Sequence, residues 1–380
     1  MSKNIVLCFD GTNNQFGPQK TNIVRLLQVL HREPGAQHVY YDPGVGTLHE
    51  PGALTRIGKR LSVLLGLAFG AGLTWKVQEA YEYLMDFWEP GDRVFLFGFS
   101  RGAYSARVLA GWLHSLGLMS HGSSNMIPYA MRLYKAVRQV GESPGEHWKL
   151  CDEFRSTFAR PVPGSGSDDR RFPVHFLGVW DTVSSVGWIW DPVTFPFTAR
   201  NPSIQIVRHA VSIDERRAFF RQNLMKEAEQ QDFRELWFPG VHCDVGGGYP
   251  DNQGELWLSP YLWILDEAIG AGMMVDTERR REFIAGSHPQ PWNDRLHESL
   301  RSLWWIAEFL PKMSGRPASP RRSPRLGLGR RRVIKEGAIM HASTLLRIRE
   351  ADYEPPNLSN DFVARVRRLS EVPDALPFSH

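Results

Sequence analysis

The chain has 380 residues, of which 42% are hydrophobic and 23% are charged, and its formal net charge is +4. These values are typical of a globular protein with a substantial core, and they exclude a disordered or fibrous chain. The longest apolar stretch, 61–75, contains several glycines and is shorter than the roughly 20 residues that a membrane-spanning helix needs. The apolar run 5–9 is too short for a signal-peptide core. We therefore expect synthesis in the cytoplasm and no transmembrane helix.

Short runs rich in β-branched and aromatic residues alternate along the chain with segments of helical period. This pattern predicts, in chain order, a strand at 5–9, a helix at 22–30, a strand at 38–41, a helix at 77–88, a strand at 93–97, a helix at 103–116, and strands at 174–180, 206–213 and 236–241. Such alternation is typical of a mostly parallel sheet with helices on both faces. We therefore predict an α/β core over 1–250, with helical insertions near 48–74 and 118–171.

The remaining residues divide into three segments. Residues 251–314 have mainly helical character and predict a helical continuation of the core or a cap. Residues 315–332 are rich in Arg, Pro and Ser and predict a flexible basic linker, which a C-terminal tail follows at 333–380. The basic residues of 316–335 suit contact with an anionic membrane, although a solvated loop explains them equally well. We expect no specific nucleic acid as a partner.

The pentapeptide Gly98-Phe99-Ser100-Arg101-Gly102 stands between a predicted buried strand and a predicted helix. A G-x-S-x-G string alone is weak evidence, but this setting forces the serine into a strained turn that presents its hydroxyl. Side chains at the two glycine positions would collide with the neighbouring strand and helix. The context therefore predicts an α/β-hydrolase fold with Ser100 as its nucleophile.

A serine nucleophile needs a histidine to accept its proton and a carboxylate to orient that histidine. In this fold the chain order is serine, acid, histidine, each at the end of a strand. His242 follows the predicted strand 236–241, and His341 is the alternative base. Asp181 closes the strand 174–180, and Asp214, which ends the next strand, is the alternative acid. We predict Ser100, Asp181 and His242 as a catalytic triad.

Two backbone N–H groups are needed to stabilise the oxyanion of an acyl-transfer reaction. Arg101, directly after the nucleophile at a helix N-terminus, is one expected donor, and Gly11 or Thr12 after the first strand is the other. Asp10 would then shape that loop. The same Asp-Gly-Thr turn also suits an aspartyl phosphatase, but that chemistry needs another aspartate where Cys8 stands.

No metal or cofactor is expected. The three cysteines, Cys8, Cys151 and Cys243, have neither the spacing of a zinc site nor that of a disulfide framework. The glycine clusters 44–46 and 246–248 lack the spacing of a nucleotide-binding loop, and turns explain them.

Two apolar segments suggest a lipid substrate. Trp188, Trp190, Phe195 and Phe197 follow the predicted acid and could line an acyl-chain pocket or lie in a lipid interface. Residues 61–73 could form a mobile lid, although a buried helix explains them as well.

Six ordered motifs across residues 4–250 resemble the catalytic domain of type VI secretion lipase effectors of the first class, a family long catalogued as a domain of unknown function in bacteria and fungi. The motifs are Phe9-Asp10-Gly11-Thr12-Asn13-Asn14, Tyr41-Asp42-Pro43-Gly44-Val45-Gly46-Thr47, Gly98-Phe99-Ser100-Arg101-Gly102-Ala103-Tyr104, Val179-Trp180-Asp181-Thr182-Val183, His209 to Arg216, and Trp237-Phe238-Pro239-Gly240-Val241-His242. The resemblance implies hydrolysis of phospholipid esters, with Ser100, Asp181 and His242 at the matching motifs. It also implies export by a signal-independent secretion system, with an immunity or delivery protein as partner.

The sequence thus predicts a serine ester hydrolase, a phospholipase or lipase that works through an acyl-enzyme. Two alternatives remain open at this point. One is an esterase or thioesterase that acts on soluble acyl substrates, and the other is a non-catalytic binding module on a hydrolase scaffold.

Overall fold

A computed structural model describes most of the chain. The described residues are 2–11, 17, 19–44, 69–136, 144–163, 171–183, 187–188, 191–192, 195–301, 304–309, 312–314 and 323–379. Thr12, Trp190, most of the predicted lid at 61–73 and residues 315–322 of the predicted linker lie outside these residues, whereas linker residues 323–332 are described.

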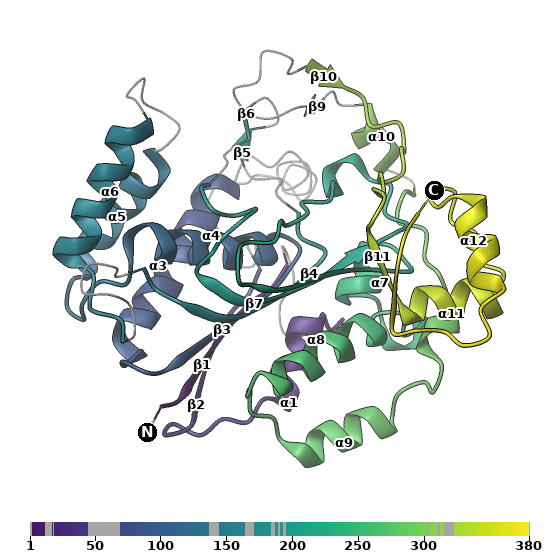
Figure 1. Cartoon of the computed structure of the whole chain (residues 1–380), viewed down its shortest axis with the longest axis horizontal. Coiled ribbons are helices and arrows are strands. Elements are labelled where there is room, and N and C mark those ends of the chain that lie inside the picture. Colours follow the sequence, from purple (N-terminus) through teal and green to yellow (C-terminus); the bar gives the residue numbers. More distant parts are fainter. Residues whose placement is uncertain are drawn as a thin grey trace.

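An eight-stranded sheet forms the centre of the fold (Figure 1). Its strands, in order across the sheet, are β12 (Ala375–Pro377), β11 (Ile339–His341), β8 (Asp232–Phe238), β7 (Ile204–Ser212), β4 (Val174–Trp180), β3 (Arg93–Phe99), β1 (Asn4–Phe9) and β2 (Gln37–Asp42). Neighbouring strands pair in parallel except β11 and β12, which are antiparallel. Two small antiparallel pairs join β5 (Gly187–Trp188) to β6 (Asp191–Pro192), and β9 (Lys312–Ser314) to β10 (Ser323–Arg325).

Helices cover both faces of this sheet. The helices of the described residues are α1 (Asn22–Val29), α3 (Phe69–Phe87), α4 (Arg101–Leu116), α5 (Ile127–Ala136), α6 (Pro144–Phe158), α7 (His242–Gly246), α8 (Leu258–Gly270), α9 (Thr277–Ala285), α10 (Trp304–Glu308), α11 (Ala342–Glu350) and α12 (Asn360–Arg367). Single 3-10 turns lie at η1 (Ser124–Met126), η2 (Ala218–Phe220), η3 (Asp251–Gln253) and η4 (Pro291–Asn293). Helices α3, α4, α5 and α6 lie on one face of the sheet, and α1 and α8 lie on the other (Figure 1). Their apolar side chains pack against the two faces of the sheet.

The first strand shows why the strands of the sheet are continuous apolar runs in the sequence. Ile5, Leu7 and Phe9 face the α3–α4 side, whereas Val6 and Cys8 face the α1–α8 side, and all five are buried. Because helices cover both faces, side chains of either direction must be apolar. The predicted α/β-hydrolase fold, with a mostly parallel sheet between two helical layers, is confirmed. In the described part of the chain, no helix has the length and apolarity to cross a bilayer.

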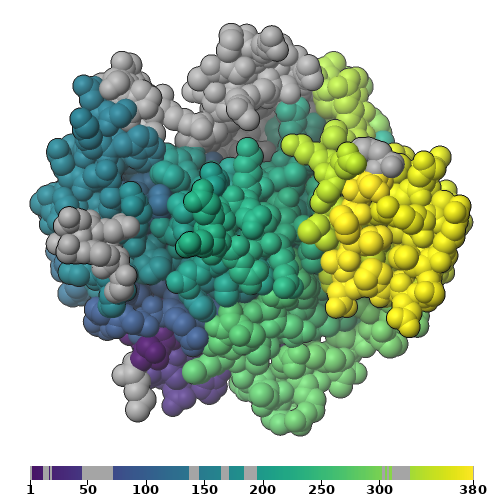
Figure 2. All heavy atoms as spheres, viewed as in Figure 1, coloured from purple at the N-terminus to yellow at the C-terminus, as the bar shows by residue number. Residues whose placement is uncertain are grey.

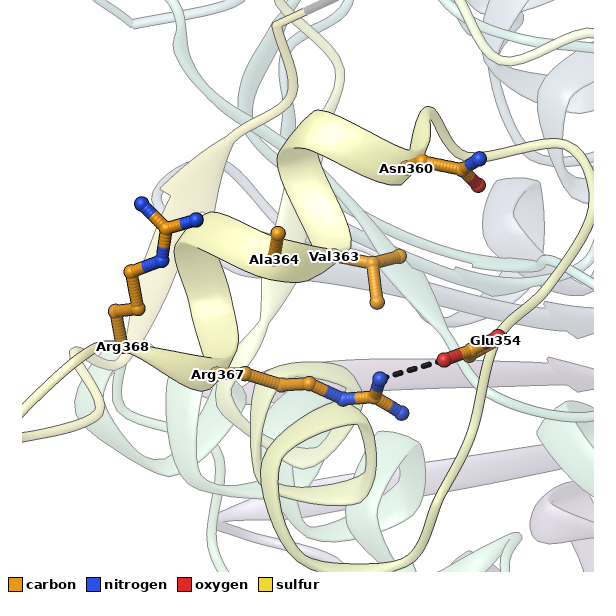
Figure 3. A pocket seen from close by; sticks show the side chains of 6 residues that line it. All are labelled: Glu354, Asn360, Val363, Ala364, Arg367 and Arg368. Atoms are coloured by element: carbon orange, nitrogen blue, oxygen red, sulfur yellow. Dashed lines mark hydrogen bonds and ion pairs between the residues drawn. The ribbon is translucent and has the colours of Figure 1, made fainter.

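The C-terminal residues, expected as a tail, extend the sheet. β11 pairs with β8, and β12 pairs with β11. A separate apolar cluster joins α11 and α12 to this end of the sheet, through Trp237, Met340, Ile348 and Phe362 among others. Each added strand has only three residues, which is too short for an alternating pattern to reveal it. A surface hollow on α12, crossed by the Arg367–Glu354 ion pair, contains none of the predicted site residues (Figure 3).

One helix fits the core so closely that it tolerates no added atom. A Cβ at Gly246, the last residue of α7, would lie 1.8 Å from the Phe99 ring. Overpacking a core costs about 1–3 kcal/mol. We expect Gly246→Ala to lower the free energy of unfolding by about 2 kcal/mol or more, as measured by urea denaturation. Gly270→Ala is the control, because nothing lies within 4 Å of its added Cβ, and it should not lower stability. Equal stabilities would contradict this packing.

Candidate active site

Ser100 occupies the sharp turn between β3 and α4. Its backbone has φ 59° and ψ −120°, a left-handed conformation that residues other than glycine rarely adopt. The end of β4 holds the turn from both sides, because the Ser100 N–H donates to Trp180 O at 3.0 Å and the Ser100 carbonyl accepts from the Val183 N–H at 3.2 Å. The neighbouring strand therefore maintains the strained backbone.

The two glycines of the pentapeptide allow close approaches on either side of Ser100. A Cβ at Gly98 would lie 2.5 Å from Ala103 Cα, inside the first turn of α4. A Cβ at Gly102 would lie 2.2 Å from Phe9 O, at the end of β1. The helix can begin directly over the ends of β1 and β3 only because both side chains are absent.

Ser100, His242 and Asp181 form one chain of hydrogen bonds. His242 Nε2 lies 2.8 Å from Ser100 Oγ, and His242 Nδ1 lies 2.6 Å from Asp181 Oδ2. A carboxylate can only accept, so Nδ1 carries the imidazole proton and Nε2 accepts from the serine hydroxyl. The three residues follow β3, β4 and β8, whose carboxyl ends lie at the same edge of the sheet.

The Asp181 carboxylate is buried, with 1% of the residue exposed, and it is surrounded by donors. Oδ1 accepts from the Ser212 N–H at 2.9 Å, and the Arg332 guanidinium bonds both oxygens, at 2.5 Å to Oδ1 and 2.9 Å to Oδ2. Burial raises the pKa of Asp181, but Arg332 and His242 outweigh it and hold that pKa well below its usual range. Asp181 is therefore an anion.

His242 begins α7 and lies between two aromatic rings. Phe99 stacks on the imidazole with centroids 4.7 Å apart, and Phe220 of η2 meets it edge-on at the same distance. Burial lowers the pKa of His242, while Asp181 raises it, and the net shift is downward. The imidazole is therefore neutral at physiological pH, which is the form that can accept a proton.

Glu215 and Arg217 support this arrangement, although they did not stand out in the sequence. The Glu215 carboxylate is buried and accepts from the backbone N–H of His242 at 3.2 Å and from Arg217 at 2.8 Å. Burial raises the pKa of Glu215, but Arg217 outweighs it, and the pKa falls to about 2. The Arg217 guanidinium also lies over the Phe220 ring, 3.7 Å from its centroid. The sequence feature that could have identified them is the charged run 214–217, which directly follows an apolar strand.

The predicted oxyanion donors have distinct surroundings. Arg101 is the first residue of α4, and burial lowers the pKa of its guanidinium to about 9. The Gly11 N–H donates to Asp10 Oδ1 at 2.7 Å, so Asp10 already occupies this group. Thr12 lies outside the described residues. Asp10 Oδ2 accepts from the hydroxyls of Thr21 and Tyr41, which ties the end of β1 to its neighbours.

The alternative acid and base have other partners. Asp214 accepts from the Gly240 N–H at 2.8 Å and from the Tyr353 hydroxyl at 2.6 Å, and burial raises its pKa to about 6. His341 accepts from the Ser343 N–H as the N-cap of α11 and stacks on Phe238, and burial lowers its pKa to about 4. The imidazole that bonds the Ser100 hydroxyl therefore bonds Asp181 rather than Asp214.

Of the four aromatic residues considered for an acyl pocket, two can be placed. Phe195 is buried against Tyr104 and Tyr134, so it is a core residue and not part of an open pocket. Phe197 is half-buried and packs edge-on against the His114 imidazole. The side chains of the other two lie outside the described residues. Within the described ranges, no cluster of His, Cys, Asp and Glu is arranged to hold a metal ion.

Comparisons with known proteins match this chain to one family. A family model described as "T6SS, Phospholipase effector Tle1-like, catalytic domain" covers residues 3–267. The uncharacterized protein YEL023C of Saccharomyces cerevisiae is 40% identical over 230 residues, which are 58% of this chain and 32% of the yeast protein. The chain thus spans about a third of the length of this curated relative.

Two solved structures, each 21% identical in sequence, are also similar. An uncharacterized protein from Pseudomonas aeruginosa has a TM-score of 0.42, over 73% of this chain and 47% of that one. The Tle1 effector, solved bound to the VgrG spike of the type 6 secretion system, has a TM-score of 0.38, over 66% of this chain and 51% of that one. The family model spans more than half of the chain and includes all three hydrogen-bonded residues. The chain therefore belongs to the family of Tle1-like phospholipase effector catalytic domains.

Proposed function

We propose that this protein is a serine hydrolase that cleaves acyl esters of phospholipids. The observation that carries the proposal is the continuous set of hydrogen bonds from Ser100 Oγ through His242 to Asp181. Three features of that set suit nucleophilic catalysis: a strained serine, a neutral imidazole and an ionised acid. Family membership supports a lipid ester as the substrate class.

The proposed reaction proceeds in two halves. His242 Nε2 accepts the hydroxyl proton as Ser100 Oγ attacks the carbonyl carbon, which leaves a negative charge on the carbonyl oxygen. The imidazolium then donates that proton to the alcohol oxygen, the ester bond breaks, and an acyl-enzyme remains. Water next attacks the acyl carbon while His242 Nε2 accepts a proton from it. The bond between the acyl carbon and Ser100 Oγ then breaks, Oγ regains the proton from the imidazolium, and the fatty acid leaves. Asp181 stays ionised throughout and stabilises the imidazolium.

The N-terminus of α4 supports the charged intermediate. Its first N–H, that of Arg101, points from a helix of 16 residues whose dipole favours negative charge. We assign Arg101 as one oxyanion donor, and Thr12 is the proposed second donor because Asp10 already holds the Gly11 N–H. The cycle uses water and these residues and calls for no metal or cofactor.

An exposed apolar surface beside the site supports contact with a membrane. Trp305 and Phe309 are 42% and 62% exposed, and Leu328 and Val333 are exposed as well. The segment at 326–329 joins α10 through hydrogen bonds to Glu308. Figure 2 shows the part of the chain after β10 in lime, on the surface beside the yellow C-terminal helices.

This surface connects to the proposed base through aromatic contacts. Trp304 packs edge-on against Phe220, which in turn meets His242. Arg330 is exposed and adds positive charge. Exposed aromatic side chains beside an arginine suit the interface of an anionic bilayer. We therefore propose peripheral binding of an anionic membrane, which would bring the substrate ester to Ser100.

Delivery into a target is a further part of the proposal. The Tle1 effector with a similar fold was solved bound to a VgrG spike. By family membership we propose a delivery protein of the type VI secretion system as a partner, export without a signal peptide, and an immunity protein that protects the producing cell.

Replacing the nucleophile tests the proposed chemistry. Ser100→Ala should lower fatty-acid release from phospholipid vesicles by about 1,000-fold or more, because among the described contacts Ser100 Oγ is the hydroxyl that bonds His242 Nε2. The thermal unfolding midpoint should stay nearly unchanged. Ser105→Ala, one turn further along α4, is the matched control, since its hydroxyl bonds only Arg101 O among the described contacts.

A fluorophosphonate probe provides an independent readout of Ser100. It should label the wild-type chain at Ser100 only and leave Ser100→Ala unlabelled. Retained fatty-acid release in Ser100→Ala would refute the assignment. A wild-type chain that folds but never labels would instead indicate a non-catalytic binding module. Release from p-nitrophenyl esters but not from vesicles would indicate a soluble acyl substrate.

Parallel substitutions of the two acids test which of them serves His242. Asp181→Asn should lower kcat by about 1,000- to 10,000-fold, because an amide stabilises neither the required tautomer nor the imidazolium. Asp214→Asn should keep kcat within about tenfold, since Asp214 bonds the Gly240 N–H and the Tyr353 hydroxyl rather than His242. The measurement is steady-state ester hydrolysis, with unfolding curves for both variants. Equal losses would contradict the choice of Asp181.

Vesicle binding tests the exposed surface. Replacing Trp305 and Phe309 with Ser should weaken co-sedimentation with phosphatidylglycerol vesicles by about tenfold or more, because each aromatic side chain loses its apolar burial. Hydrolysis of a short soluble ester should not change. The matched control replaces Phe87 and Phe158, which are comparably exposed at the ends of α3 and α6. An equal loss in that control would show that the surface has no special role.

A further inference from the structure

Arg332 bonds both oxygens of the Asp181 carboxylate, one of which also bonds His242. Its side chain is 4% exposed, although it ends a run of basic residues that resembles a solvated linker. Beyond its two bonds to Asp181, Nη1 donates to the carbonyl and hydroxyl oxygens of Ser212, and Nη2 donates to Phe220 O at 2.6 Å. The residue lies beyond position 267, so the family match assigns it no role.

We propose that Arg332 is a positioning residue that fixes the Asp181 carboxylate toward His242 and offsets part of its charge. The proposal rests on the proposed hydrolase function of Ser100. Among the described contacts, Arg332 bonds neither Ser100 nor His242, so it would act through Asp181.

The hydrogen bonds to Asp181 hold its carboxylate in a single orientation. Each carboxylate oxygen accepts about two hydrogen bonds. Oδ1 accepts from the Ser212 N–H and from Arg332, and Oδ2 accepts from His242 and from Arg332. Rotation of the carboxylate would break several of these bonds at once. Only a planar guanidinium fork can bond both oxygens, since a lysine would act as a point charge.

The Arg332 guanidinium also restrains Phe220, whose ring packs against the His242 imidazole. Its bond to Phe220 O holds the turn that places the Phe220 ring edge-on to His242. Arg217 covers the same ring. Arg332 therefore fixes both the acid that orients His242 and an aromatic ring that packs against it.

Several charged and titratable groups act on the imidazole from different elements. They are Asp181 after β4, and Glu215 and Arg217 after β7. Other titratable groups on the neighbouring elements are Cys243 and Asp244 in α7, Tyr249, and His297, which pairs with Asp244. Arg332 acts through Asp181. Of these cations, Arg332 alone bonds the acid in the described contacts. Without it, the full negative charge of Asp181 would act on the imidazole, and the pKa of His242 would rise. The base would then stay protonated to a higher pH.

The test is the pH dependence of fluorophosphonate labelling at Ser100, which reports activation of the nucleophile without a natural substrate. Between pH 4 and 9 the wild-type rate should rise with pH as His242 loses its proton. Arg332→Met should lower the plateau by about 100-fold and move the midpoint of this rise to higher pH by about one unit. KM for a p-nitrophenyl ester should stay within about threefold.

Two further variants separate charge from geometry. Arg332→Lys keeps the charge but not the fork, so the midpoint should return to the wild-type value while the plateau stays about tenfold low. Arg331→Met is the matched control, because Arg331 is the adjacent arginine and, in the described contacts, its ion pair is with Asp214, at 3.7 Å, and not with Asp181. It should match the wild type in both the plateau and the midpoint.

An unchanged midpoint in Arg332→Met overturns the proposal even if the plateau falls, because a purely structural anchor would reduce the rate without changing its pH dependence. If Arg332→Met shows no cooperative unfolding, the test rests on Arg332→Lys instead. A plateau labelling rate equal to that of the wild type in Arg332→Lys then overturns the proposal. A wild-type chain that does not label at Ser100 refutes the proposed function itself, and the role of Arg332 falls with it.

Discussion

The buried negative charge of Asp181 is the constraint on which the rest of the site depends. Removing a carboxylate from water costs several kcal/mol unless charged and hydrogen-bonding partners replace the solvent. Here the partners come from three elements: the end of β7, the start of α7, and the segment before β11. Each partner must reach the edge of the sheet where β4 ends. The position of His242 against Ser100 therefore follows from how the fold neutralises one carboxylate.

Two neighbouring strand ends carry buried carboxyl groups, yet their surroundings give them opposite properties. Asp181 meets a bidentate arginine and is held as an anion. Asp214 meets a phenol and a backbone N–H, while Arg331 stays 3.7 Å away, and burial raises its pKa to about 6. Both aspartates follow apolar strands, so the strand pattern does not distinguish them. The choice between them depends on the arginine that the distant chain supplies.

The sequence predicted what local patterns encode. The turn at Ser100 could be predicted because a buried strand, two glycines and a helix are contiguous, and Asp181 and His242 because each ends a strand. Arg332 could not, since it reaches Asp181 across 151 positions of the chain and looks no different from Arg330 and Arg331. Strands β11 and β12 could not be predicted, because each has only three residues, too few to show an alternation of apolar and polar side chains. The roles of the proposed triad and of Thr12 stay predictions until activity is measured.

Asp181 and Arg332 are 151 positions apart in the chain, so they are synthesised at different times. Ser100, Asp181 and His242 leave the ribosome well before position 332, so the emerging chain holds its acid without the guanidinium that neutralises it. A buried carboxylate without its cation is unfavourable, and the edge of the sheet stays incomplete until the later segment joins it. If the proposed hydrolase function holds, the site would be complete only once Arg332 has joined the edge of the sheet beside Asp181.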